Sequence, residues 1–160
     1  MQKITPFLWF DGNAEEAVQF YLSVFKEGKI ISTAHYPEGS PGENQPGTVM
    51  TIAFELNGQQ FVALNGGPGF PFTNAVSLVV NCESQEEIDH FWEKLAADGG
   101  EQIQCGWLKD KFGMPWQIVP SKIWDWLSDE DPARVQRVTA QVWQMEKLDM
   151  AALERAAAGS

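Results

Sequence analysis

The chain repeats one strand-helix pattern, and this repeat limits its possible folds more than any other feature. Residues 4–28 (ITPFLWFDGNAEEAVQFYLSVFKEG) match residues 75–99 (AVSLVVNCESQEEIDHFWEKLAADG) position by position at a constant offset. Each copy starts with a short apolar segment that is typical of a buried strand, and continues with apolar residues at the spacing of an amphipathic helix. The repeat predicts a fold made of two copies of one module.

The two expected helices share their start and stop signals. Asn13 and Ser84 are favourable N-cap residues, and each is followed three positions later by a glutamate, Glu16 or Glu87, as in a capping box. Both helices are expected to end at a glycine in the left-handed C-terminal cap conformation. These glycines are Gly28 and Gly99.

Three strands are expected after each helix. In the first copy they span residues 29–37, 48–56 and 59–65. The dipeptide Asn57-Gly58 between the last two is the strongest short-range signal for a two-residue hairpin. In the second copy three shorter strands are expected within residues 101–120. Each copy is therefore expected to be a β-α-β-β-β module.

The expected fold class is α+β, with two tandem modules forming a curved mixed sheet with a cleft. One domain, residues 1–120, holds module one (1–66) and module two (74–120). Residues 121–160 read as a helical extension with too many apolar residues for a free tail, so it should pack on the sheet or on a partner subunit. Two Gly/Pro-rich loops that could cover a pocket span residues 38–47 and 65–72.

Charge and cysteine content exclude several classes of function. The formal charge is −11, with 22 acidic and 11 basic residues, and such a field disfavours nucleic acid and anionic membranes but could attract a cationic small molecule. No apolar run approaches the length of a membrane span, and no signal peptide is visible. Cys82 and Cys105 form neither a zinc pattern nor a disulfide framework. A cytoplasmic location is expected.

Four segments together resemble a known family. They are NAEEAVQFY, SQEEIDHFW, QQFVALNGG and CGWLKDKFGMPWQIVP, the last being the most specific. They look like the PhnB-like branch of the glyoxalase/bleomycin-resistance (vicinal oxygen chelate) superfamily, in which some members carry the label 3-demethylubiquinone 3-methyltransferase. The resemblance covers nearly the whole chain up to Pro120 and, more loosely, the segment KLDMAALERA at residues 147–156. It implies half-barrel sheets, a cleft formed by paired modules, and a homodimer.

In metal-using members of this superfamily, the resemblance implies a histidine near the start of each module and a glutamate on the last strand. Counted from the motifs, those places hold Pro6, Ser77 and Gln117. A fourth place falls near Leu64 or Asn65. These residues are poor ligands for divalent transition metals, so no metal site is expected. No Gly-rich turn joins a strand to a helix, so no cofactor is expected either.

The aromatic content favours a site for an organic molecule, because such sites combine apolar and aromatic walls with a few polar groups. Cys105 and His35 are candidates for a catalytic group, although a buried thiol and a solvent-facing histidine are the plainer interpretations. The expected ligand-binding residues are Trp9, Trp107, Trp116, Gln117, Asn65 and Ser77.

The leading hypothesis is a metal-independent protein that binds a small organic molecule in an aromatic-lined cleft. A second hypothesis is an enzyme of the isomerase, lyase or group-transferase class, including the methyltransferase label, that works through Cys105 or His35. A third is a structural or regulatory dimer. Binding of a ligand that raises the melting temperature would distinguish the first two from the third.

Overall fold

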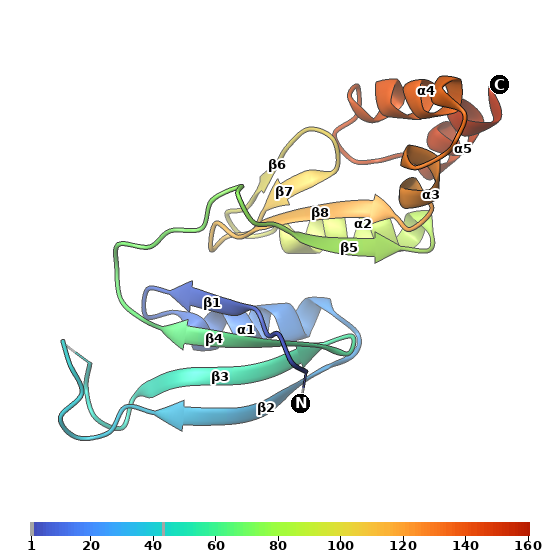
Figure 1. Ribbon diagram of the computed structural model, residues 1–160. Coiled ribbons are helices and arrows are strands. Elements are labelled where there is room, and N and C mark those ends of the chain that lie inside the picture. Colours follow the sequence, from blue (N-terminus) through green and yellow to red (C-terminus); the bar gives the residue numbers. More distant parts are fainter. Residues whose placement is uncertain (1, 43) are drawn as a thin grey trace. The chain divides into compact units, whose positions relative to one another are not determined.

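The computed structural model describes residues 2–42 and 44–160, and the chain divides into two compact units. Unit one (Met1–Pro71) holds module one, and unit two (Phe72–Ser160) holds module two together with the helical extension. Each unit contains one four-stranded mixed sheet with a helix against it (Figure 1). The expected α+β class and the tandem β-α-β-β-β order are confirmed.

Unit one is built from β1 (Phe7–Phe10), α1 (Ala14–Val24), β2 (Gly28–His35), β3 (Val49–Leu56) and β4 (Gln59–Asn65). The strand order is β1-β4-β3-β2, in which β1 and β4 run parallel and the other neighbours run antiparallel. Asn57 and Gly58 have φ values of +46° and +85°, as the expected hairpin between β3 and β4 requires.

Module two is built from β5 (Leu78–Cys82), α2 (Gln85–Leu95), β6 (Glu101–Gln102), β7 (Trp107–Lys109) and β8 (Pro115–Pro120). Its order, β5-β8-β7-β6, repeats that of unit one, with β5 parallel to β8. The last three strands are shorter than the sequence predicts, because residues 103–106 and 110–114 form turns.

Side chains alternate between the two faces of each sheet, and the module's own helix covers only one face. In unit one Leu8 and Phe10 are buried on the α1 side, whereas Phe7 is 57% exposed on the other face. In unit two Trp116 and Ile118 are buried on the α2 side. We call the face away from the module's helix the open face.

The two helices begin in different ways. In α2 the Oγ atom of Ser84 accepts a hydrogen bond from the Glu87 N–H at 3.2 Å, and the Glu87 carboxylate accepts one from the Glu83 N–H at 2.7 Å. In α1 the side chain of Asn13 makes no cap hydrogen bond. The Oδ1 atom of Asn65, at the end of β4, accepts from the Ala14 N–H at 2.8 Å instead. A distant residue therefore replaces the expected local cap.

The expected glycine caps are wrong. Helix α1 ends at Val24, and Gly28 is the first residue of β2 without a positive φ. Glycine suits this position because a Cβ atom would lie 3.0 Å from the Glu55 carbonyl oxygen and 2.7 Å from Cδ2 of Leu22. Helix α2 ends at Leu95, so Gly99, although its φ is +117°, lies in the turn beyond the helix.

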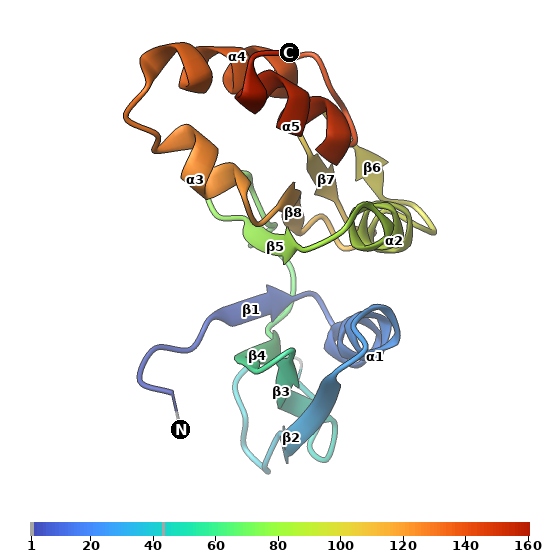
Figure 2. The same cartoon turned by 90° about the vertical axis from the view of Figure 1, so that its right-hand side faces the viewer.

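The extension consists of α3 (Ile123–Leu127), α4 (Pro132–Val142) and α5 (Met150–Ala158). Figures 1 and 2 show these helices near the ends of β5 and β8. They bury one apolar cluster against Val119 on the open face of β8, and the indole of Trp124 donates to Oδ1 of Asn81 at 2.7 Å. The other cluster members are Ile123, Val138, Leu148, Leu153, Ala156 and Ala157. The extension is expected to pack either on the sheet or on a partner subunit, and in the structure it packs on the sheet of its own unit.

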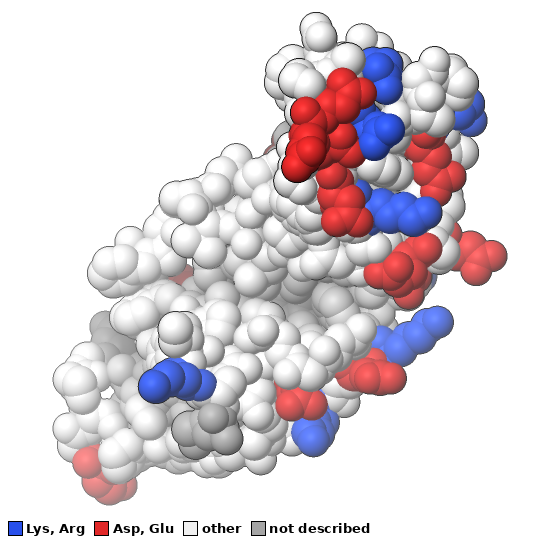
Figure 3. Space-filling model, turned by 45° about the vertical axis from the view of Figure 1, so that its right-hand side comes forward, with Lys and Arg blue, Asp and Glu red and all other residues white. Residues whose placement is uncertain are grey.

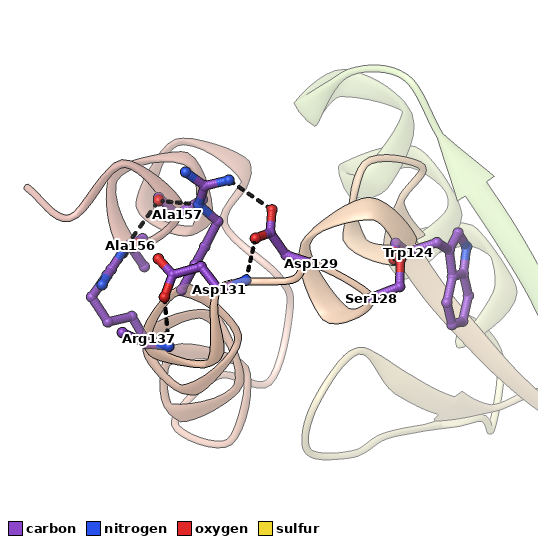
Figure 4. Close-up of polar contacts among 9 residues, drawn as sticks. Trp124, Ser128, Asp129, Asp131, Arg137, Ala156 and Ala157 are labelled. Carbon is purple, nitrogen blue, oxygen red and sulfur yellow. Dashed lines mark hydrogen bonds and ion pairs between the residues drawn. The ribbon is translucent and has the colours of Figure 1, made fainter.

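Polar contacts inside the extension fix its helices to one another. The guanidinium of Arg137 donates to the Ala156 carbonyl at 2.8 Å, and the Asp131 carboxylate caps the start of α4 (Figure 4). Acidic and basic side chains also lie next to one another at the top of Figure 3. Exposed ion pairs contribute only about 0–1 kcal/mol each to folding stability. The packing of the extension is therefore stabilised mainly by the apolar cluster.

The segment between α4 and α5 joins the extension to module two. The Cys105 and Gly106 N–H groups donate to the carbonyls of Met145 and Glu146 at 2.7 and 2.8 Å. The side chain of Gln85 donates to the Leu148 carbonyl at 3.1 Å and accepts from the Met150 N–H at 2.8 Å. The extension is thus an integral part of unit two. Within the described residues, no helix is long and apolar enough to cross a membrane.

The motif DKFGMPW forms the turn between β7 and β8 around a buried carboxylate. Asp110 is 2% exposed. Its carboxylate accepts from the N–H groups of Phe112 and Met114 at 2.9 and 3.0 Å, and from the indole of Trp116 at 2.9 Å. Gly113 supplies the positive φ of the turn, +84°. The most specific motif of the sequence is therefore explained by turn architecture.

Replacing Asp110 tests this account. Asp110→Ala leaves three donors in and around the turn without their acceptor, so the free energy of unfolding should fall by about 3 kcal/mol or more. Urea denaturation followed by circular dichroism measures the change. Asp125→Ala removes the same charge from an exposed position and should cost less than about 0.5 kcal/mol. Equal effects of the two substitutions would contradict the role of Asp110.

Candidate functional site

Three of the residues expected to bind a ligand come together on the open face of module two. The amide of Gln117 donates to Oγ of Ser77 at 2.9 Å. Trp107 lies directly across from Gln117 on the neighbouring strand, and Val79 lies across from it on the other side. Val79 is 37% exposed. The result is a hydroxyl-amide pair flanked by an indole and an aliphatic side chain.

Trp116 lies on the opposite face. It is only 3% exposed, and its indole is held by the Asp110 carboxylate. Because consecutive residues of a strand point to opposite faces, Trp116 and Gln117 cannot line the same surface. Trp116 therefore supports the turn that precedes β8, while Gln117 reaches the open face.

In unit one Trp9 lies on the open face, and its ring is held by its own module. The indole donates to the Gly67 carbonyl at 2.8 Å, and the ring meets Phe70 edge-on at 4.9 Å between centroids. Gly66 allows this approach, since a Cβ atom there would lie 2.3 Å from the indole. Trp9 thus fixes the segment that follows β4.

The β1–α1 and β5–α2 connections differ in length. This changes which residue of unit one corresponds to Ser77. The Phe10 carbonyl accepts from the Gly66 N–H, and the Cys82 carbonyl accepts from the Ser121 N–H, both at 2.9 Å. Phe10 and Cys82 are therefore equivalent, but the N-cap position of α1, Asn13, comes three residues later, whereas that of α2, Ser84, comes two residues later. The constant offset fails in the strands for this reason. The counterpart of Ser77 is Thr5 rather than Pro6.

The places implied for metal ligands do not fit a divalent metal ion. Thr5, Ser77 and Gln117 offer neutral hydroxyl and amide groups, and the last two are hydrogen-bonded to each other. Zn²⁺, Mn²⁺ and Fe²⁺ prefer imidazole, thiolate or carboxylate ligands. Within residues 2–42 and 44–160, no three His, Cys, Asp or Glu side chains are grouped so that they could hold a metal. No chemical step through a metal is therefore derived.

The residues do not form a nucleotide-type cofactor site either. The Gly-rich segment 65–70 follows β4, and the next regular element of the chain is strand β5 rather than a helix. A phosphate-binding turn needs the N-terminus of a helix immediately after the glycines. No step through a methyl-donor cofactor is derived.

Neither candidate catalytic group has a hydrogen bond to Ser77 or Gln117 among the described residues. His35 is exposed at the end of β2, and its imidazole has no hydrogen-bond partner among the described residues. Cys105 is half-buried in a turn with φ of +64°, and its N–H is bonded to the extension. Burial, together with the nearby Glu87 and Glu83 carboxylates, raises the pKa of the Cys82 thiol to about 12.

A polar cavity of about 360 Å³ lies in unit one, at the end of β4 and the start of α1. Asn65 is the one expected site residue on its wall. The loop 38–47, expected as a cover, contributes Asn44 and Gln45. The remaining lining residues are Asp11, Gly12, Glu15, Tyr36, Thr48, Val49 and Gly67. Sequence reasoning missed Asp11 and Glu15, because acidic residues beside a helix start are common.

Comparisons with known proteins agree with the fold. A family model described as 3-demethylubiquinone-9 3-methyltransferase matches residues 2–119. A solved PhnB protein from Bacillus cereus, described as a 3-demethylubiquinone-9 3-methyltransferase, is 43% identical over 74% of this chain and 99% of its own, with a TM-score of 0.66. Protein PA1353 from Pseudomonas aeruginosa is 21% identical over 74% of this chain and 96% of its own, with a TM-score of 0.60. A search of curated proteins finds no significant match.

The cysteines should differ in reactivity. Because the thiolate is the reactive form, Cys82 should resist iodoacetamide at about pH 8 in the folded protein, whereas half-buried Cys105 should be alkylated. Mass spectrometry of the folded protein should therefore find one label. Cys105→Ser should remain unlabelled until urea unfolds it. Rapid labelling of Cys82 in the folded variant would contradict its burial.

Proposed function

The chain belongs to the 3-demethylubiquinone-9 3-methyltransferase family, in the PhnB-like branch of the vicinal oxygen chelate superfamily, and from this we propose that it binds a small organic molecule without a metal ion. The observation that carries the proposal is the hydrogen bond between Ser77 and Gln117 beside Trp107. Two neutral hydrogen-bonding groups stand where metal-using members of the superfamily are expected to hold ligands.

The pair can hold an oxygen-bearing ligand by hydrogen bonds alone. The Ser77 hydroxyl accepts from Gln117, so its own proton is free to be donated, and the Gln117 amide keeps one further N–H and its carbonyl oxygen. A carbonyl or hydroxyl group of the ligand could be met by these atoms. Each such bond contributes about 0.5–1.5 kcal/mol, so the affinity must come largely from apolar contact.

Apolar contact is supplied by the same face. Trp107 is half-buried and Val79 is partly exposed, on either side of Gln117. Their side chains offer a flat aromatic surface and an aliphatic edge to the body of the ligand. The proposal is therefore a planar organic molecule with at least one oxygen atom, held over β5, β8 and β7.

A screen of planar carbonyl and phenol compounds by thermal shift tests the proposal. A compound that binds the native state must raise the melting temperature. Its effect should be lost in Trp107→Ala and fall about tenfold in potency in Gln117→Leu. The matched control is Trp143→Ala, which removes a tryptophan that is 69% exposed on the extension and should leave the effect intact. A hit that is equally insensitive to all three variants would refute this site.

Metal removal provides a separate test. After the protein is dialysed against EDTA, a compound identified in the thermal-shift screen should keep its dissociation constant within about twofold, because no coordinate bond to a metal contributes to binding. Isothermal titration of treated and untreated protein measures this. If affinity were lost on dialysis and restored by Zn²⁺, Mn²⁺ or Fe²⁺, metal-independent binding would be ruled out.

A further inference from the structure

The polar cavity is lined by residues of unit one, whereas Ser77 and Gln117 belong to unit two, and we infer that the cavity binds the ammonium or guanidinium group of a small organic cation. The cavity has a volume of about 360 Å³. This lies within the range of small-molecule sites, roughly 300–1,000 Å³, although at its lower end. It is therefore suited to a fragment-sized molecule.

Five segments of unit one contribute to the cavity wall, so it is a feature of the tertiary fold rather than of one helix end. They are the β1–α1 connection, the first turn of α1, the end of β2 with the loop 38–47, the start of β3, and the end of β4. Gly12 and Gly67, both on the wall, have φ values of +77° and +88°, a backbone conformation that favours glycine.

The charge of the lining favours a cation. Asp11 and Glu15 are the charged residues among those that line it, and the described lining contains no lysine, arginine or histidine. Among the uncharged polar residues of the lining, Asn44, Gln45 and Thr48 carry side-chain oxygen atoms that can accept hydrogen bonds. An ammonium group has donors and no acceptor, which matches this set. A carboxylate or phosphate would meet two like charges.

The Glu15 carboxylate is held in place by Asn65. The Nδ2 atom of Asn65 donates to Oε1 of Glu15 at 2.6 Å and to the Val49 carbonyl at 3.0 Å. The Oδ1 atom of Asn65 accepts a hydrogen bond from the Ala14 N–H, and the backbone carbonyl of Asn65 accepts one from the Tyr36 hydroxyl. With Oε1 occupied, Oε2 of Glu15 has no hydrogen-bond partner among the described residues. A fixed carboxylate with one free oxygen can receive a cation with little loss of side-chain entropy.

The repeat supplies an internal comparison for the alternative role of Glu15, which is stabilisation of the helix dipole. Glu86 is the second residue of α2, as Glu15 is of α1. Glu86 is exposed and lines no cavity described for unit two. Ser84 caps α2, so that helix start needs no counterpart of Asn65. An effect of the helix dipole should be the same at both positions, whereas a cation site should depend on Glu15 alone.

The experiment uses three probes of matched size, benzylamine, benzyl alcohol and benzoate, which are cationic, neutral and anionic near neutral pH. Isothermal titration into the full chain should show benzylamine binding at least about tenfold more tightly than the other two. Glu15→Gln should weaken benzylamine about tenfold. Glu86→Gln should change its affinity less than about twofold, because it removes the same charge from the same helical position.

Three results would overturn the inference. They are no detectable binding of benzylamine, equal binding of the three probes, or equal effects of Glu15→Gln and Glu86→Gln. Trp107→Ala and Gln117→Leu should leave benzylamine binding unchanged. If those variants abolished it while Glu15→Gln did not, the cation would bind at the Ser77–Gln117 pair. The cavity inference would then fail while the proposed function stood.

Discussion

The structure depends on one constraint, namely that each four-stranded sheet has a single helix to cover it. The helix buries every second side chain of the strands, and the alternate side chains must find another partner or remain accessible. In unit one these include Phe7 and Trp9, and in unit two they include Val79 and Gln117. The chemistry of the open faces therefore follows from which residue types occupy the alternate positions.

In unit two the extension covers part of the open face. Trp9 and Asn81 occupy equivalent positions on the two sheets, as the pairing of Phe10 and Cys82 with the following segments indicates. In unit one this position holds Trp9, whose own indole donates a hydrogen bond to the Gly67 carbonyl. In unit two it holds Asn81, and the indole that contacts it comes from Trp124 of the extension. The extension lies beyond residue 119, where the family match ends. It covers one end of the open face and leaves the Ser77–Gln117 pair outside the apolar cluster.

The sequence was sufficient to predict the modules, because helix periodicity, the Ser84 cap and the Asn57-Gly58 hairpin are local signals. It also indicated Ser77, Gln117 and Trp107, which the strand register brings together. It misplaced Trp116 beside Gln117, although strand alternation alone separates them. The cap that Asn65 provides for α1, and the cavity around it, depend on a contact between residues 51 positions apart. No local pattern encodes a contact of that range.

The unequal strand-helix connections also bear on how the two copies can evolve. A hybrid gene that joined the first strand of one copy to the helix of the other, at positions aligned on the helices, would shift the strand by one residue. Every side chain of that strand would then exchange faces, and the core residues would point away from the helix. A junction inside the strand would therefore need a one-residue change in the connection to restore the burial pattern. The difference in length thus ties each first strand to its own connection, and the two would have to be exchanged together to keep the apolar side chains facing the helix.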